Sequence, residues 1–240
     1  MAKFNLAKLL KENEYPGRGI VVGKSKDGKS AMIAYFIMGR SENSRNRIFE
    51  RFDGGMRTKA FDESKLVDPS LIIYNPFLQL ENIDIITNGD QTDTVYNYIK
   101  ENGDDGYAFD KALHTREFEP DKPNYTPRIS GILNYANGDF TYKLSILKSS
   151  EGNPETCDRF FYSYGALNGI GHFIHTYKEN GNPIPSFYGE PEQVELPNTA
   201  EELADMVWEN LNEDNKVSLF VRVVSLEDGK ATEKIINKNK

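Results

Sequence analysis

The chain has 240 residues, of which 38% are hydrophobic and 28% charged, a balance typical of a soluble globular protein. Its net charge of −8 argues against nucleic acid as a partner, and no apolar run approaches the ~20 residues of a membrane span. A single cysteine, Cys157, excludes an internal disulfide, so the expected location is the cytoplasm.

Charge is unevenly distributed along the chain. Residues 18–59 carry ten lysines and arginines against four acidic residues, a local charge of +6, so the remainder carries −14. A basic N-terminal quarter in an acidic protein suits a small phosphorylated ligand. Solvated strand faces explain the same charges equally well.

The first elements expected are a short helix and a hairpin. Residues 4–13 have the apolar spacing of a helix that docks one face. Residues 18–23 and 30–38 are expected strands, and Asp27-Gly28 between them is a strong hairpin signal.

The same region contains a motif that points elsewhere. The letters from Gly23 to Ser30 match G-x4-G-K-S, the phosphate-binding loop of nucleotide hydrolases. That motif requires a helix after the loop, whereas residues 31–38 are a β-branched and aromatic run closed by Gly39. The hairpin therefore explains these residues better.

Four arginines follow in the segment 39–51, namely Arg40, Arg45, Arg47 and Arg51. Guanidinium groups bind phosphate through paired N–H donors, so this cluster suits a phosphoribosyl ligand. In an extended segment Arg45 and Arg47 point to the same side. Surface arginines without a ligand are the alternative.

The stretch 74–94 is expected to combine a strand, a turn and a helix start. Ile83 and Ile85 alternate with Asp84 in the strand, and the chain breaks at Asn88-Gly89. Asp90 or Thr92 would cap a helix whose apolar face contains Val95, Tyr98 and Ile99. A helix start of this kind suits an anionic or carbonyl-bearing ligand, but plain turn and cap chemistry also explains these residue types.

The rest of the chain is expected to add strands at 57–61, 71–74, 128–135, 140–148, 159–164, 169–177 and 217–224, and helices at 107–114 and 200–211. Asn137-Gly138 indicates a hairpin turn, residues 180–198 a long loop, and the lysine-rich tail a frayed end. This order predicts an α+β fold in one domain over residues 1–240, with an extra N-terminal helix at 1–14 and a loop insertion at 178–198.

Two histidines invite a metal interpretation. His172 and His175 are three residues apart on an expected strand, so their side chains point to opposite faces. No cysteine or carboxylate stands at a ligand spacing beside them. The sequence therefore predicts neither a metal nor an organic cofactor.

Several spaced motifs together resemble the archaeal-type IMP cyclohydrolases, which close the purine ring of formyl-AICAR to give IMP. They are Tyr74-Asn75, Thr87-Asn88-Gly89, Thr92-Asp93-Thr94, Thr126-Pro127-Arg128-Ile129, and G-R-x3-V-G at 17–23. The resemblance covers about residues 15–148. It implies a four-layer α/β/β/α sandwich of mostly antiparallel sheets like that of the N-terminal-nucleophile hydrolases, and a phosphorylated purine-pathway ribonucleotide as the partner.

The resemblance also implies site residues. Tyr74 becomes the expected donor to the formyl oxygen and Glu119 the proton carrier, with Arg40 as a third catalytic residue. The expected substrate-binding residues are Arg18, Arg45, Arg47, Asn75, Asn88, Gly89, Thr92, Asp93, Thr94 and Arg128. Either Arg45 or Arg47 is the counterpart of a family arginine.

Three alternatives stay open at this point. The chain departs from the family in its leading helix, its C-terminal insertions and Asp90-Gln91, where a small residue and a histidine are expected. These departures fit an enzyme acting on another phosphorylated ribonucleotide.

A non-catalytic nucleotide-binding module is the second alternative. An amide hydrolase would need a nucleophile at the mature N-terminus, which only self-cleavage before Thr156 or Cys157 would supply. The oligomeric state is open, with a homo-oligomer among the options.

Overall fold

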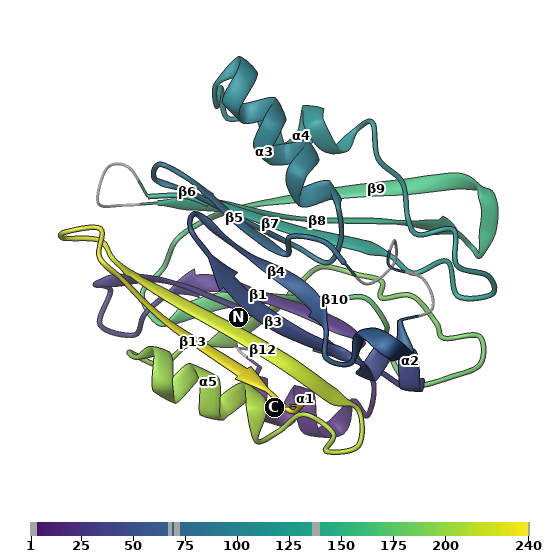
Figure 1. Cartoon of the computed structure of the whole chain (residues 1–240). Coiled ribbons are helices and arrows are strands. Elements are labelled where there is room, and N and C mark those ends of the chain that lie inside the picture. Colours follow the sequence, from purple (N-terminus) through teal and green to yellow (C-terminus); the bar gives the residue numbers. More distant parts are fainter. Residues whose placement is uncertain (1–3, 67–68, 70–72, 136–139, 240) are drawn as a thin grey trace.

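Two antiparallel sheets face each other in the computed structural model, which describes residues 4–66, 69, 73–135 and 140–239 (Figure 1). The first sheet runs in the order β11 (Glu192–Glu195), β10 (Ile170–His175), β1 (Arg18–Lys24), β2 (Ser30–Met38), β12 (Lys216–Ser225) and β13 (Ala231–Asn237). The second runs in the order β3 (Arg47–Phe52), β4 (Gly55–Ala60), β5 (Phe77–Leu80), β6 (Ile83–Thr87), β7 (Arg128–Asn134), β8 (Thr141–Ser150) and β9 (Asn153–Gly165).

Helices cover the outer face of each sheet. Helices α1 (Leu6–Glu12) and α5 (Ala200–Trp208) pack on the first sheet, and α3 (Gln91–Asn102) and α4 (Ala108–Leu113) pack on the second (Figure 1). The short helix α2 (Glu42–Arg45) and a 3-10 turn (Glu63–Lys65) lie in connections. The α+β class with mostly antiparallel sheets is therefore confirmed.

The core between the sheets is apolar and continuous. Ile20 and Ile33 of the first sheet meet Ile86 and Ile129 of the second in one buried cluster. Alternation along the strands produces this core, because every second side chain points inward. The outer faces form two further clusters with the helices.

One ion pair crosses this apolar core. Arg222 of β12 donates from Nε to Asp84 Oδ2 of β6 at 2.7 Å, and both side chains are buried. Arg222 also pairs with Glu233 of β13. Burial raises the pKa of Asp84 to about 6, although Arg222 opposes that shift. The pair connects the two sheets. Burying its two charges carries a desolvation cost, which their mutual attraction offsets.

Most sequence expectations in the first half are confirmed. Strands β1 and β2 pair antiparallel across Asp27-Gly28, and the run after the phosphate-loop letters is strand β2. Helix α3 begins after Asp90, which makes no side-chain cap hydrogen bond. The strand expected at 71–74 falls partly outside the described residues, and Tyr74 itself is not in a strand.

Three expectations are wrong. The C-terminal tail is not frayed, because Ala231–Asn237 pairs with β12 along its whole length as β13. The loop at 180–198 contains strand β11. The segment 39–51 is not extended throughout, because Ser41 caps the short helix α2, which places Arg45 in a helix while Arg47 begins β3. The turn expected at Asn137-Gly138 lies outside the described residues, while the β7–β8 pairing around it is present.

Candidate active site

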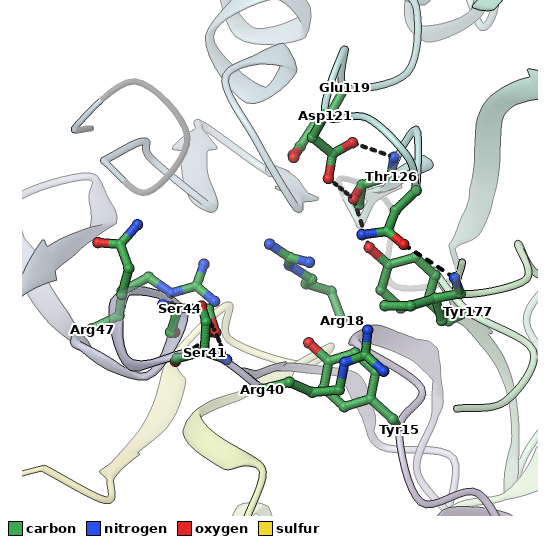
Figure 2. A pocket seen from close by; sticks show the side chains of 13 residues that line it. Tyr15, Arg18, Arg40, Ser41, Ser44, Arg47, Glu119, Asp121, Thr126 and Tyr177 are labelled. Atoms are coloured by element: carbon green, nitrogen blue, oxygen red, sulfur yellow. Dashed lines mark hydrogen bonds between the residues drawn. The ribbon is translucent and has the colours of Figure 1, made fainter. Parts of the chain in front are cut away.

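The candidate site is a cavity of about 290 Å³ at the end of the molecule where β1, β3 and β7 begin. Its charged lining consists of Arg18, Arg40, Arg47, Glu119 and Asp121 (Figure 2). Tyrosines and hydroxyl residues complete the wall, among them Tyr15, Ser41, Ser44, Thr126 and Tyr177. The volume is at the lower end of the range for small-molecule sites.

Arginines 18 and 47 supply hydrogen-bond donors that are not used within the described protein. Arg47 is fully buried and donates from Nε to Ser44 O at 2.8 Å and from Nη2 to Met38 O at 3.3 Å. Its Nη1 and the Nε of Arg18 are buried and have no partner among the described residues. Burial, together with Arg18, lowers the pKa of Arg47, but an arginine stays protonated. A bound anion would satisfy these donors.

Arg40 connects the cavity to the segment after β10. Its Nη1 donates to Asn180 Oδ1 at 2.6 Å and to Gly181 O at 2.8 Å, and its guanidinium lies 5.1 Å from the centre of the Tyr15 ring. This segment, which the sequence predicts only as a loop, therefore holds one of the cavity arginines in place.

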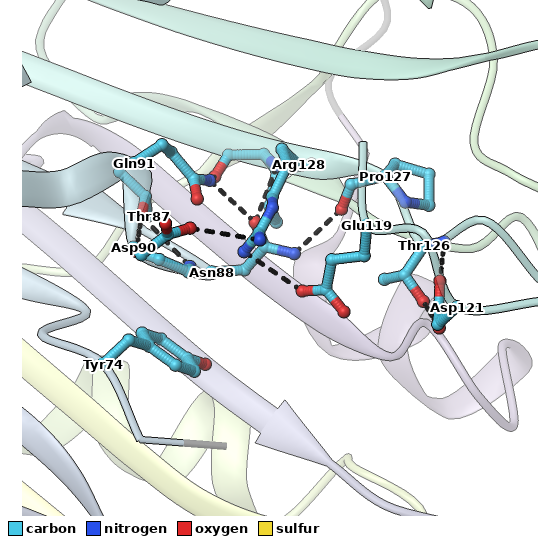
Figure 3. Close-up of polar contacts among 12 residues, drawn as sticks. Tyr74, Thr87, Asn88, Asp90, Gln91, Glu119, Asp121, Thr126, Pro127 and Arg128 are labelled. Atoms are coloured by element: carbon cyan, nitrogen blue, oxygen red, sulfur yellow. Dashed lines mark hydrogen bonds and ion pairs between the residues drawn. The ribbon is translucent and has the colours of Figure 1, made fainter. Parts of the chain in front are cut away.

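Glu119 is buried beside Arg128 at the other side of the cavity. Arg128 Nη1 lies 3.2 Å from Glu119 Oε1, and Arg128 Nη2 lies 3.1 Å from Asp90 Oδ1 (Figure 3). Burial raises the pKa of Glu119, and the charges of Arg128 and Arg18 oppose that shift. A carboxyl group with a raised pKa is suited to proton transfer near neutral pH.

Gly89 makes the position of Arg128 possible. A Cβ atom at residue 89 would lie 1.5 Å from Arg128 Nη1, the same nitrogen that pairs with Glu119. The glycine of the Thr-Asn-Gly motif thus provides space for the guanidinium group, and does not itself line the cavity.

Tyr74 forms a phenol pair beside the arginines. Its hydroxyl lies 2.9 Å from that of Tyr35, and both rings are buried. Burial lowers the pKa of Arg18. The opposite effect comes from Glu119 and from the phenols of Tyr177, Tyr15 and Tyr74, and the net pKa of Arg18 is raised. Tyr74 is therefore within electrostatic range of the cavity arginines, but it does not itself line the cavity and stands apart from the Asn88–Arg128 network (Figure 3).

The remaining residues of the central stretch bond to the protein itself. Asn88 donates to Pro127 O at 2.8 Å and accepts from Ile129 N at 2.9 Å, which joins the turn to β7. The Thr92 hydroxyl lies 2.6 Å from that of Thr87 and is fully buried. Asn75 donates to Asp93, and Thr94 is half-buried; none of the four expected residues Asn75, Asn88, Thr92 and Asp93 lines the cavity.

Arg45 points away from the cavity. Its Nε donates to Gly39 O at 2.9 Å and its Nη2 to Asn215 Oδ1 at 3.2 Å. Of the two arginines that the resemblance leaves open, only Arg47 lines the cavity.

Sequence reasoning missed one wall of the cavity. Tyr177 follows β10, and its hydroxyl lies 2.6 Å from Thr126 Oγ1, which in turn donates to Asp121. The ring of Tyr177 is stacked on Tyr15 at 5.8 Å, and a Cβ at Gly17 would meet it at 2.4 Å. In the sequence, the Gly17-Arg18 pair was the one hint of this wall. A glycine beside a site arginine suggests that another side chain packs against it, but does not say which residue that is.

The two histidines lie on opposite faces of β10, as predicted. His172 Nδ1 is 2.6 Å from the Tyr142 hydroxyl, and its ring is stacked on Tyr164 at 3.6 Å. Burial lowers the pKa of His172 to about 4. His175 Nδ1 donates to Tyr177 O at 2.7 Å. Within the described ranges, no three His, Cys, Asp or Glu side chains gather closely enough to hold a metal ion.

Comparison with known proteins gives a consistent result. Residues 15–229 match the family described as IMP cyclohydrolase-like protein. The chain belongs to this family. It is 27% identical to an IMP cyclohydrolase of Methanocaldococcus jannaschii over 218 residues, 88% of this chain and 94% of that protein.

Two further archaeal IMP cyclohydrolases match a shorter part of the chain. The protein from Methanosphaera stadtmanae is 32% identical and that from Methanococcus aeolicus 31% identical, each over 120 residues. In both, the match spans 50% of this chain and 58% of the relative. The IMP cyclohydrolase-like match thus extends past the motifs of the first 148 residues and includes the Tyr177 wall. No helix in the described part of the chain is long and apolar enough to cross a membrane.

Proposed function

We propose that this chain is an IMP cyclohydrolase, which closes the ring of formyl-AICAR to IMP with loss of water. The observation that carries the proposal is the meeting of a buried glutamate with arginines whose N–H groups are unpartnered at one cavity. Family membership and the names of the archaeal relatives support the same reaction. We also infer that the order helices, sheet, sheet, helices is the sandwich of the N-terminal-nucleophile hydrolases.

The phosphate of the substrate would bind at the basic side of the cavity. Arg18 of β1 and Arg40 and Arg47 of the segment 39–51 all line it (Figure 2). The unpartnered Arg18 Nε and Arg47 Nη1 would each gain a charge-assisted hydrogen bond. Such a ligand removes the cost of leaving buried donors unsatisfied.

Ring closure needs little beyond positioning and proton transfer. The carboxamide nitrogen attacks the formyl carbon of the same molecule, so holding the two groups together removes much of the entropic cost. The formyl oxygen gains negative charge and takes a proton, and the Tyr74 hydroxyl is assigned as its donor. Glu119, whose pKa is raised by burial, then gives a proton to the departing hydroxyl as water leaves, and takes back the N–H proton that the formamido nitrogen loses as the C=N bond forms. Arg128 holds Glu119 in place through the 3.2 Å contact.

The experiment that tests the proposal is a spectrophotometric assay of formyl-AICAR conversion with Tyr74→Phe and Tyr35→Phe. Both variants break the same 2.9 Å hydroxyl contact, but only the first removes the assigned donor. We expect Tyr74→Phe to lower kcat about 100- to 1,000-fold with little change in KM, as for loss of a donor to a developing oxyanion. Tyr35→Phe should lower it less than about tenfold, because the remaining phenol keeps its proton.

The other outcomes separate the alternatives. Equal losses in both variants would mean that Tyr74 acts through packing and would overturn its assignment. A wild-type protein that binds IMP tightly without converting formyl-AICAR would be a nucleotide-binding module. Conversion of a different phosphorylated ribonucleotide instead would reassign the substrate and leave the cavity as the site.

A further inference from the structure

A chain of hydrogen bonds joins three side chains of the cavity wall, from Tyr177 through Thr126 to Asp121. The Tyr177 hydroxyl lies 2.6 Å from Thr126 Oγ1, and Thr126 Oγ1 donates to Asp121 Oδ2 at 2.5 Å (Figure 2). The backbone N–H of Thr126 also donates to Asp121 Oδ1 at 2.6 Å. Tyr177 and Thr126 are buried and Asp121 is half-buried. The hydrogen bonds therefore connect a buried hydroxyl to a carboxylate that is partly exposed to solvent.

The direction of these bonds follows from the number of protons available. A carboxylate oxygen only accepts, so the single hydroxyl proton of Thr126 points at Asp121. Thr126 Oγ1 can then only accept from the Tyr177 O–H. The phenol proton is therefore directed into the wall, and the free lone pair on Tyr177 Oη is available to a ligand in the cavity.

Tyr177 is one of several hydrogen-bond acceptors at the cavity. Arg18, Arg40 and Arg47 present only donors, and Glu119 is paired with Arg128. The Asp121 carboxylate and the amide oxygen of Asn43 also line the cavity, but neither oxygen carries a proton to pass on as it receives one. Tyr177 is also rigid, because its ring is stacked on Tyr15 and fills the space left by Gly17. A rigid phenol with its lone pair exposed suits a ligand group that carries N–H protons.

We propose that Tyr177 is a further catalytic residue, which accepts the proton released by the attacking carboxamide nitrogen, and that Thr126 and Asp121 position it and relay that proton. This inference rests on the proposed function. As the nitrogen–carbon bond forms, the nitrogen proton moves to Tyr177 Oη, the phenol proton to Thr126 Oγ1 and the threonine proton to Asp121. The carbonyl electron pair moves to the formyl oxygen, which Tyr74 protonates. Before the next turnover, Asp121 releases its proton to solvent and Tyr74 regains one from solvent.

The relay differs from simple base catalysis by a phenolate. Burial raises the pKa of Tyr177 to about 12, although Arg18 opposes the shift, so the phenol is protonated at neutral pH. Tyr177 therefore passes a proton on as it receives one, and Asp121 stores it. The proton tasks of the reaction are then divided, with Tyr74 on the formyl oxygen, Glu119 on the departing hydroxyl and the relay on the attacking nitrogen.

The test is the kinetics of formyl-AICAR conversion by Tyr177→Phe, Thr126→Val and Thr126→Ser. Tyr177→Phe keeps the ring that is stacked on Tyr15, and valine keeps the shape of threonine without its hydroxyl. We expect Tyr177→Phe and Thr126→Val each to lower kcat about 100-fold, the range for loss of one proton-transfer group, with IMP affinity within about threefold of wild type. Thr126→Ser restores the hydroxyl and should recover most of the loss. The double variant Tyr177→Phe/Thr126→Val should be no worse than either single one, because both interrupt the same path.

Controls separate this inference from the proposed function. Tyr162→Phe removes a different tyrosine hydroxyl, which donates to Gly189 O at 2.9 Å outside the cavity, and should leave kcat unchanged. An active wild type with Tyr177→Phe and Thr126→Val both within about threefold of it would overturn the relay and leave the cyclohydrolase intact. Equal damage by Thr126→Ser and Thr126→Val would also overturn it, since the hydroxyl would then be irrelevant. An inactive wild type would overturn both proposals.

Discussion

The guanidinium group of Arg128 occupies the space that a Cβ atom of residue 89 would need, 1.5 Å from that position. Asp90 and Glu119 each form an ion pair with the guanidinium, so moving it away from residue 89 breaks at least one of these contacts. The absence of a side chain at one turn residue therefore sets the position of the proposed acid on another loop.

Replacing Gly89 by alanine should damage the site more than the fold. The methyl group displaces Arg128 Nη1 from Glu119, so we expect kcat/KM for formyl-AICAR to fall about 10- to 100-fold and the free energy of unfolding to fall by about 1–3 kcal/mol. Gly165→Ala is the matched control, because a Cβ there meets nothing within 4 Å and its backbone is not left-handed. An unchanged kcat/KM in Gly89→Ala would mean that Arg128 does not position Glu119.

The two neighbouring arginines 45 and 47 should differ sharply when each is replaced by lysine. Arg47 has an unpartnered Nη1 at the cavity, so Arg47→Lys should weaken IMP binding about 10- to 100-fold in calorimetric titration, the loss of one charge-assisted hydrogen bond. The Arg45 side chain bonds to Gly39 and Asn215 away from the cavity, so Arg45→Lys should bind IMP like the wild type. If Arg45→Lys weakened IMP binding and Arg47→Lys did not, the phosphate site would lie on the other side of α2.

The Asp84–Arg222 pair predicts a loss of stability as the pH rises. A folded-state pKa of about 6 lies above the ordinary value of 3.8, so the folded protein binds more protons between these two values than the unfolded chain. The stabilisation from protonated Asp84 is complete below about pH 4 and is lost as the pH passes about 6, on the order of 3 kcal/mol at most. In urea unfolding from pH 4.5 to 7.5, the difference in the free energy of unfolding between the wild type and Asp84→Asn should show this slope. Parallel curves would assign the slope to other groups.

His172 should behave in the opposite sense. Its folded-state pKa of about 4 is below the ordinary 6.5, so the folded protein excludes a proton that the unfolded chain binds. Its contribution to stability is complete above about pH 6.5 and is lost as the pH falls toward 4. The direct measurement is the ring-proton chemical shift of His172, assigned by comparison with His172→Gln, which should stay that of neutral imidazole at pH 5.5. A midpoint near 6.5 would contradict the burial argument.

Local patterns were sufficient for much of the fold. The Asp27-Gly28 turn, the alternation around Asp84 and the capping of α5 by Thr199 are decided by neighbours in sequence, and these elements form where expected. Strand β13 was not predictable in this way, because its extended structure depends on pairing with β12 and on the ion pair of Glu233 with Arg222.

The site shows the same division between local and distant causes. The resemblance pointed to Glu119 and Arg128, and the residue types in 39–51 to the arginine cluster, but the choice between Arg45 and Arg47 depends on a four-residue helix that Ser41 caps. Tyr177 is far from every motif in sequence and reaches the cavity only because β10 pairs beside β1. Side chains that long-range pairing brings to a cavity have no signature in a single sequence.

The end of β3 nearest the cavity depends on a strand made much later in synthesis. Asn237 of β13 accepts a hydrogen bond from Phe49 N at 2.8 Å and donates one to Phe49 O at 3.1 Å, and β3 begins at Arg47. Contacts of such large sequence separation form slowly, since the loop between them must close first. On the ribosome, we therefore expect the nascent chain to lack affinity for nucleotide until residue 237 has emerged from the exit tunnel, so that binding competence arrives in one late step.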